Sequence, residues 1–145
     1  MRGIVLRILG LDYGDSRVGV AVSDESQKIA FDCGIIDAKK GKRFVAEQVL
    51  STMDRYATNK VIIGYPMNMD GSCGFRVKAT EKFARFLHEQ RPEIIIEFFD
   101  ERLTTKSADA ALLEMGVSQR HKGMNDIIAA MLILQAYLDR QSNAE

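Results

Sequence analysis

The chain is poor in the residues that build disulfide and zinc sites. Only two of its 145 residues are cysteine and two are histidine. Cys33 and Cys73 are far apart in the sequence, and neither has ligand-like neighbours, so we expect reduced, structural thiols and no zinc site. A chain of this length can bury about 70% of its unfolded surface, so it needs no disulfide or structural metal to fold.

The sequence also lacks an excess of charge and a long apolar segment. It has 20 basic and 20 acidic residues, so its overall charge gives no reason to expect a polyanionic partner, and only local clusters could do so. No uncharged stretch reaches the roughly 18 residues that a membrane span requires. The N-terminal apolar run contains Arg7 and meets Asp12 instead of a cleavage site. We therefore expect a cytoplasmic protein that does not associate with membranes.

Apolar runs and helical spacing predict a single α/β domain over residues 1–145, with a five-stranded mixed sheet flanked by helices. The first three strands are joined by short polar turns and should run antiparallel, whereas strand–helix–strand alternation later in the chain implies parallel pairing. The expected strands are residues 4–11, 18–22, 29–36, 61–64 and 94–99. The expected helices are residues 44–56, a second one that ends before Pro92, 107–115, and 126 to about 140, followed by a frayed tail at 141–145.

Three acidic residues stand at the ends of these elements. Asp12 closes the first apolar run, Glu101 follows the fifth strand, and Asp126 opens the apolar stretch 127–138. Ligands gather outside the carboxyl ends of parallel strands, so the three carboxylates could converge on one hard divalent cation. Phosphodiester hydrolysis is a reaction that such a site supports, because two cations bridged by a shared carboxylate stabilise both the attacking and the leaving oxygen.

Each acidic residue also has a purely structural alternative. Asp12 could be a turn residue that bonds its own backbone. The segment 100–105 could simply connect a strand to a helix, with Thr104 or Thr105 as the N-cap. Asp126 could cap the last helix, although Asn125 could do so equally well.

Several cations lie where they could bind phosphate. Arg76 and Lys78 follow a polar loop that begins at Asn68 and leads into a helix N-terminus, while Arg102 and Lys122 lie close to the acidic residues in sequence. The alternative for the loop is a tight Asp-Gly turn beside a solvated helix face. A second basic cluster, residues 39–43, is of a kind that is usually only a solvated surface. Two tyrosines, at positions 13 and 65, could stack on bases or pack over the sheet edge.

Taken together, four sequence blocks resemble the bacterial YqgF (RuvX) family, whose members are described as pre-16S rRNA nucleases and Holliday junction resolvases. Each block is weak alone, but their order and spacing are specific, and they cover nearly the whole chain. The blocks are Gly10-Leu11-Asp12-Tyr13-Gly14 with Arg17-Val18-Gly19-Val20-Ala21, then Gly64-Tyr65-Pro66-Met67-Asn68-Met69-Asp70-Gly71, then Asp100-Glu101-Arg102-Leu103-Thr104-Thr105, and finally Lys122 with Asp126 and Ala129-Ala130.

The resemblance implies an RNase H-like fold and a Mg²⁺-dependent endonuclease, with Mn²⁺ as a possible substitute, that trims the 5′ end of the small-subunit rRNA precursor in the cytoplasm. Asp12, Glu101 and Asp126 would bind the metal and, with Lys122, form the catalytic set. The predicted substrate-binding residues are Arg17, Asn68, Arg76, Lys78 and Arg102.

Two positions depart from the family pattern. Tyr65 replaces a more usual aliphatic residue, and Asn125 replaces a small aliphatic one. Whether Asp100 shares the ligand role of Glu101 stays open.

Other functions remain compatible with the sequence. The partners implied are structured RNA and ribosomal precursor particles, or branched DNA if the protein is a junction resolvase, and the chain could be a monomer or a homodimer. A non-catalytic nucleic-acid-binding factor in transcription or ribosome assembly is a third possibility. An actin-like or sugar-kinase-like ATPase is disfavoured, because that superfamily needs two lobes and this chain is long enough for one.

Overall fold

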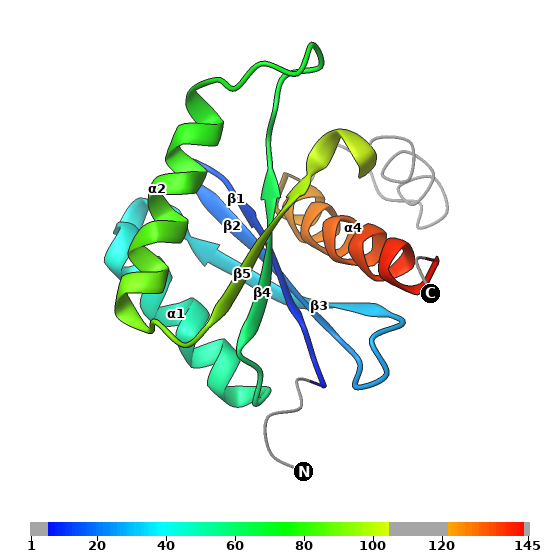
Figure 1. Ribbon diagram of the computed structural model, residues 1–145. Helices are drawn as coiled ribbons and strands as arrows, with labels where there is room; N and C mark the ends of the chain where they lie inside the picture. The colour runs from blue at the N-terminus through cyan, green and yellow to red at the C-terminus, as the bar shows by residue number, and fades with distance from the viewer. Residues whose placement is uncertain (1–5, 105–121, 144–145) are drawn as a thin grey trace.

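The computed structural model describes residues 6–104 and 122–143, with side chains of the second segment described from residue 128 onward. Five strands form one mixed sheet in the order β3-β2-β1-β4-β5 (Figure 1). This confirms the predicted α/β fold class and sheet. The strands are β1 (Leu9–Tyr13), β2 (Arg17–Ser23), β3 (Ala30–Asp37), β4 (Lys60–Tyr65) and β5 (Ile95–Asp100).

Strand directions follow the predicted pattern and fix where the chain can build a site. β1, β2 and β3 pair antiparallel, whereas β4 pairs parallel with both β1 and β5. The carboxyl ends of β1, β4 and β5 therefore lie at one edge of the sheet. Residues that follow these three strands can meet there although they are distant in sequence.

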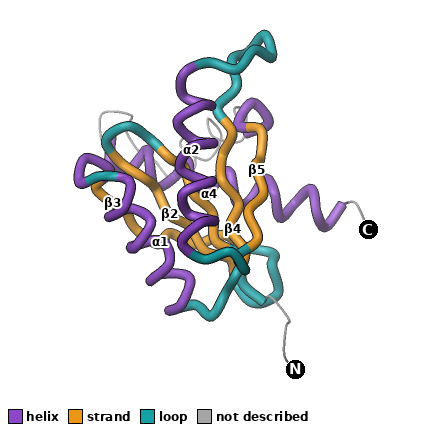
Figure 2. The backbone as a smooth tube through the Cα atoms, turned by 60° about the vertical axis from the view of Figure 1, so that its left-hand side comes forward, coloured by secondary structure: helices purple, strands orange, loops and turns teal. Residues whose placement is uncertain are grey.

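Helices cover the two faces of the sheet. α1 (Lys42–Arg55) and α2 (Phe75–Gln90) lie on one face, and α4 (Lys122–Asn143) lies on the other (Figures 1 and 2). Two short 3-10 helices, η1 (Ala38–Lys40) and η2 (Glu101–Thr104), follow β3 and β5. In the described residues, no helix is long and apolar enough to cross a membrane.

The central strands are buried on both faces because their side chains alternate between two apolar clusters. Leu9, Leu11 and Val61 pack in the cluster beneath α1 and α2, while Ile62 packs beneath α4. Gly10 allows α4 to approach β1 closely, since a Cβ there would lie 2.8 Å from the Cβ of Leu134. This contact fixes α4 along the strand that carries Asp12.

Several element boundaries differ from the predicted ones. Asp12 lies within β1 instead of after it. α2 begins at Phe75, directly after Gly74, whose backbone is extended. Its buried residues begin at Val77. The helix therefore starts two residues before its first buried side chain. The predicted helix 107–115 lies outside the described residues.

The last helix is longer than predicted at both ends. α4 begins at Lys122 instead of Asp126 and continues to Asn143. Its final turns are held to the β2–β3 hairpin, where the Gln141 side-chain amide donates to the Gln27 side chain at 2.8 Å. The expected fraying at residues 141–143 is therefore wrong, because this contact supports a turn that has no apolar anchor of its own.

Candidate functional site

A polar cavity of about 320 Å³ lies where β1, the following turn, α2 and η2 meet. It contains two of the three predicted metal-binding acids and two of the predicted substrate-binding residues. The lining residues are Asp12, Gly14, Asp15, Ser16, Arg17, Arg76 and Glu101. The cavity therefore combines carboxylates with guanidinium groups at the carboxyl edge of the sheet.

The tight turn after β1 forms one wall of this cavity. The Gly14 backbone N–H donates to the Arg17 carbonyl oxygen at 3.0 Å, which closes the turn. A Cβ at Gly14 would lie 2.6 Å from that same oxygen, so a glycine is needed there. The closed turn brings Ser16 and Arg17 back beside Asp12, which faces Gly19 across the β1–β2 pair.

Glu101 reaches the cavity from the opposite side, because β5 runs parallel to β4. The pairing of Tyr65 with Asp100 places Glu101 just beyond the end of the sheet. A Cβ at Gly64 would lie 2.5 Å from the Glu101 carboxylate and 2.6 Å from the Ile133 side chain. The carboxylate thus occupies space that exists only because residue 64 has no side chain.

The two carboxylates of the cavity destabilise each other's charge. The pKa of Glu101 is raised from 4.5 to about 7, first by burial and then by the negative charge of Asp12, while the nearby Arg76 opposes the shift. Among residues 6–104 and 128–143, no side chain donates a hydrogen bond to the Glu101 carboxylate. A cation that binds between these acids would stabilise both negative charges and lower the pKa of Glu101.

Arg76 is held in place at the mouth of the cavity. It lies in the first turn of α2, and its guanidinium donates to the carbonyl oxygen of Tyr13 at 3.0 Å. This contact ties α2 to the end of β1 next to Asp12. The aromatic ring of Tyr13 stacks on Phe83 with centroids 4.4 Å apart, which strengthens the same junction.

Asp100 and Arg102 pair with each other on either side of Glu101. The Arg102 guanidinium donates from Nε and from a terminal nitrogen to the Asp100 carboxylate, at 2.7–3.0 Å, and its backbone N–H donates as well, at 3.0 Å. These contacts hold the pKa of Asp100 below its usual range. Neither residue lines the cavity, and Arg102 holds the η2 turn through these contacts. Phosphate binding by Arg102 stays a prediction.

The remaining predicted substrate-binding residues lie outside the cavity. Asn68 stabilises its own loop: its side chain donates to the Ser72 hydroxyl at 2.9 Å, and its carbonyl accepts from the Gly71 N–H at 2.9 Å. Gly71 has a φ of +90°, as the predicted Asp-Gly turn requires. Lys78 is exposed on α2. Phosphate binding by these two residues stays a prediction.

Lys122 and Asp126 are placed only through the backbone of α4. Both lie in its first two turns, so Asp126 stands inside the helix and the idea that it or Asn125 caps the helix start is wrong. Asp126 precedes Ala130 by one turn, and the Ala130 carbonyl packs against Gly10 of β1. The side chains of residues 122–127 are outside the description, and elsewhere in the described chain no group of three metal-ligating side chains occurs.

Sequence reasoning missed Asp15 and Ser16 as cavity residues. The only feature of the sequence that could have identified them is their position, in a turn that directly follows the strand of the candidate ligand Asp12.

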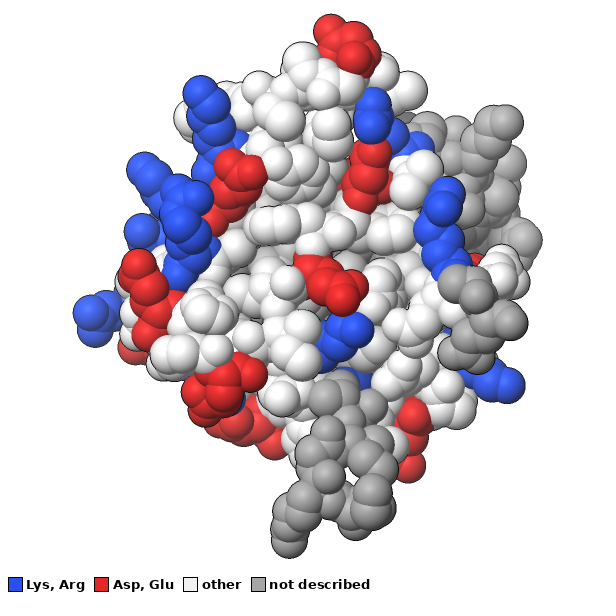
Figure 3. Space-filling view, viewed as in Figure 1, with Lys and Arg blue, Asp and Glu red and all other residues white. Residues whose placement is uncertain are grey.

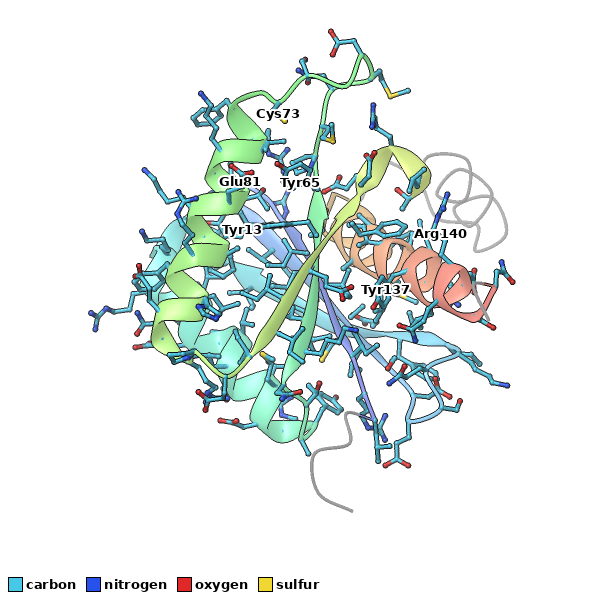
Figure 4. All side chains as sticks on the ribbon, in the orientation of Figure 1. Tyr13, Tyr65, Cys73, Glu81, Tyr137 and Arg140 are labelled. Carbon is cyan, nitrogen blue, oxygen red and sulfur yellow. The ribbon has the colours of Figure 1, made fainter. Side chains whose placement is uncertain are left out.

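Tyr65 has a packing role instead of an open stacking surface. Its hydroxyl donates to Glu81 at 2.6 Å and its ring lies 5.0 Å from that of Phe98, as Figure 4 shows for the tyrosine and its acidic partner.

Comparison with known proteins identifies related chains. Residues 6–140 match the family model described as RuvX: Holliday junction resolvase. A relative from Ruminiclostridium cellulolyticum is 40% identical over 136 residues, covering 93% of this chain and 95% of the relative. Another, from Natranaerobius thermophilus, is 42% identical over 139 residues, covering 95% and 97%. Both are described as "Putative pre-16S rRNA nuclease". The family resemblance predicted from the four sequence blocks is thereby confirmed.

Solved structures with the same fold include RuvC proteins. Thermus thermophilus RuvC in complex with a Holliday junction substrate aligns with a TM-score of 0.63 at 14% identity, covering 94% of this chain and 96% of that one. A second Thermus thermophilus RuvC structure aligns with a TM-score of 0.56. At this identity the likeness concerns the fold, which is the RNase H-like one that the sequence predicted.

Proposed function

The chain belongs to the RuvX family, and from this premise we propose that it is a divalent-metal-dependent endonuclease that trims the 5′ end of a pre-16S rRNA in the cytoplasm. The observation that carries the proposal is the convergence of Asp12 and Glu101 on one cavity, beside Arg17 and Arg76. The names of the curated relatives support the rRNA substrate. Nuclease membership supports a phosphodiester bond as the target.

The donor set of the cavity fits Mg²⁺ or Mn²⁺. Magnesium prefers a small number of carboxylates and completes its shell with water and phosphate oxygens, and the described side chains offer the carboxylates of Asp12 and Glu101. The pKa of Glu101, which burial and then the charge of Asp12 raise, supports a site that a bound cation would stabilise. When bound, the metal would supply an activated water and stabilise the charge that develops on the phosphate oxygens.

The chain's own residues position the substrate. Arg76 is anchored on the Tyr13 carbonyl and would neutralise a phosphate oxygen from the α2 side. Arg17, which also lines the cavity, would hold a neighbouring phosphate. The Asp100–Arg102 pair keeps η2 in the conformation that delivers Glu101. We assign Asp126 as the third metal ligand and Lys122 as a cation near the reacting phosphate, because the first turns of α4 precede its contacts with Gly10.

Cleavage of matched substrates tests the proposal. A labelled pre-rRNA fragment would be incubated with wild type, Asp12→Asn and Glu101→Gln, with and without Mg²⁺, and the cut ends mapped. We expect both variants to lose about 100-fold or more in rate, since the metal contributes several kcal/mol to transition-state stabilisation. Glu47→Gln, an exposed acid on α1, is the matched control. Full activity of Asp12→Asn would remove Asp12 from the mechanism.

Metal binding separates an enzyme from a binding factor that has lost its active site. Titration calorimetry with Mg²⁺ or Mn²⁺ should show binding by the wild type that Asp12→Asn weakens strongly. Nucleic-acid binding without any Asp12-dependent metal binding would favour the non-catalytic factor.

Junction DNA is the second candidate substrate, favoured by the description of the matching family model. A resolvase must cut two strands symmetrically and would therefore act as a symmetric dimer. Cleavage of a four-way DNA junction should be compared with that of the RNA under identical conditions. Sedimentation as a monomer in the presence of junction DNA would count against the resolvase.

A further inference from the structure

A group of four exposed cations lies outside the cavity, in the segment that links β3 to α1. Lys39, Lys40, Lys42 and Arg43 occupy four of five consecutive positions, and we call them the basic corner. Within the described residues, none of them forms an ion pair. The nearest acid in sequence, Asp37, accepts the Lys39 backbone N–H instead, at 3.0 Å.

The basic corner adjoins the cavity. The backbone N–H of Ala38, the first residue of η1, donates to the carbonyl of Ser16 at 2.9 Å, and Ser16 lines the cavity. Asp37 is also the strand partner of Arg17, another lining residue. On its other side the corner contacts α2, because the Lys42 ammonium lies 4.8 Å from the ring centroid of Phe86. Figure 3 shows Lys and Arg side chains along the edge of the molecule beside α2, with acidic side chains between them.

The fold itself does not require these cations. α1 begins with Lys42 and Arg43, has no acidic residue in its first turn, and is preceded by Gly41, which makes no side-chain cap. Cations at a helix N-terminus face the positive end of the helix dipole, so Lys42 and Arg43 are unfavourably placed for α1 itself. Contacts of Lys40 with Phe44, at 5.0 Å, and of Lys42 with α2 hold the ammonium groups at the surface.

The cavity, in contrast, cannot attract a polyanion by its own charge. Its lining holds three acids, Asp12, Asp15 and Glu101, against two arginines, so it carries no positive excess. A phosphate would enter it against repulsion unless other contacts held the flanking backbone nearby. Affinity for nucleic acid comes mainly from cations that neutralise phosphates.

We propose that the basic corner binds the phosphate backbone of the nucleic acid next to the phosphate in the cavity. This inference rests on the proposed function and adds a substrate path to it: the strand passes from the cavity over the β1–β2 turn and η1 to the start of α1. The partner is a polynucleotide, because four cations beside an acidic cavity suit repeated phosphates and not a single phosphate monoester.

The salt dependence of binding tests this path without requiring cleavage. Binding of a labelled pre-rRNA fragment and of a DNA junction would be measured by fluorescence anisotropy from 50 to 300 mM KCl without divalent metal. The variants are Lys39→Gln/Lys40→Gln/Lys42→Gln, the same three positions changed to Arg, and the control Lys28→Gln/Arg140→Gln, whose exposed side chains lie outside both the corner and the cavity. Thermal melting would check that each variant is folded.

We expect the Gln triple variant to reduce the slope of log K against log salt by about 2, since each phosphate contact contributes roughly 0.7–0.9. A slope change of 2 corresponds to about 100-fold weaker binding at 0.1 M salt, if binding at 1 M is unchanged. The Arg variant and the control should bind like the wild type.

Equal slopes for the Gln variant and the control would overturn the inference while leaving the nuclease proposal intact, and would direct attention to an acidic protein as the partner of the corner. If the wild type binds and cleaves neither nucleic acid, the proposed function fails together with the inference.

Discussion

Replacing Glu101 by glutamine should stabilise the protein at neutral pH while it abolishes cleavage. The carboxylate is partly buried, lies close to Asp12, and receives no hydrogen bond from the described side chains. Glutamine has the same shape and should keep the packing over Gly64. The variant therefore removes an unfavourable charge without opening a cavity, which is the trade between stability and activity that functional sites often show.

The size and sign of the effect follow from the pKa of Glu101. Burial and Asp12 raise this pKa from 4.5 to about 7, so the folded protein binds a proton more tightly than the unfolded chain does. Between pH 4.5 and 7 the wild type loses stability with rising pH, at about 1.4 kcal/mol for each pH unit. The loss attributable to this group is on the order of 3 kcal/mol by pH 7–8. Glu101→Gln has no such loss.

Urea denaturation from pH 4.5 to 8, without divalent metal, measures this difference. Relative to its value at pH 4.5, the unfolding free energy of Glu101→Gln minus that of the wild type should rise by about 3 kcal/mol at pH 8. Ionisable groups away from the cavity cancel in the comparison, whereas Asp12 interacts with Glu101 and contributes to the difference. Glu47→Gln, an exposed change on α1, should show no such trend. A difference that is independent of pH would refute the proposed electrostatics of the cavity.

Two further substitutions probe the surroundings of the site. Gly64→Ala places a Cβ 2.5 Å from the Glu101 carboxylate, so it should lower the unfolding free energy by about 1–3 kcal/mol and slow cleavage. The control is Gly74→Ala, whose Cβ would meet atoms no closer than 3.4 Å and which should have neither effect. Tyr65→Phe removes the hydrogen bond that Tyr65 donates to Glu81. In the wild type this hydrogen bond is the main reason that the pKa of Tyr65 is raised to about 12. In urea denaturation, the unfolding free energy of the wild type should exceed that of Tyr65→Phe by less than about 1 kcal/mol near neutral pH. This difference should disappear as pH rises from 10 to 12.

Local patterns in the sequence were sufficient to predict the sheet. β4 and β5 are short runs of branched and aromatic residues, and the turns between β1, β2 and β3 leave room only for antiparallel pairing. Boundaries were less certain, because a helix or strand can extend past its apolar stripe when a neighbour supports it. Gln141 is an example, since the side chain that supports it lies in a hairpin more than 100 residues earlier.

The site could be predicted only in part, because its properties depend on contacts between distant segments. That Asp12 and Glu101 share an edge followed from strand order. The partial burial of Glu101 depends on the missing side chain at Gly64, on another strand. Arg102 illustrates a local contact that the sequence left open: its guanidinium pairs with Asp100 two residues away, whereas the sequence was equally compatible with two solvated charges.

The distribution of positive charge around the cavity gives the strongest physical argument for a metal. In the described part of the chain, Arg102 is paired with Asp100, and Arg76 lowers the pKa of Glu101 only in part, so burial and the charge of Asp12 still raise it to about 7. A protein that needed this acid only for structure would gain by replacing it. A site that releases a proton when a divalent cation binds would instead need an acid of this kind, as the proposed metal site does.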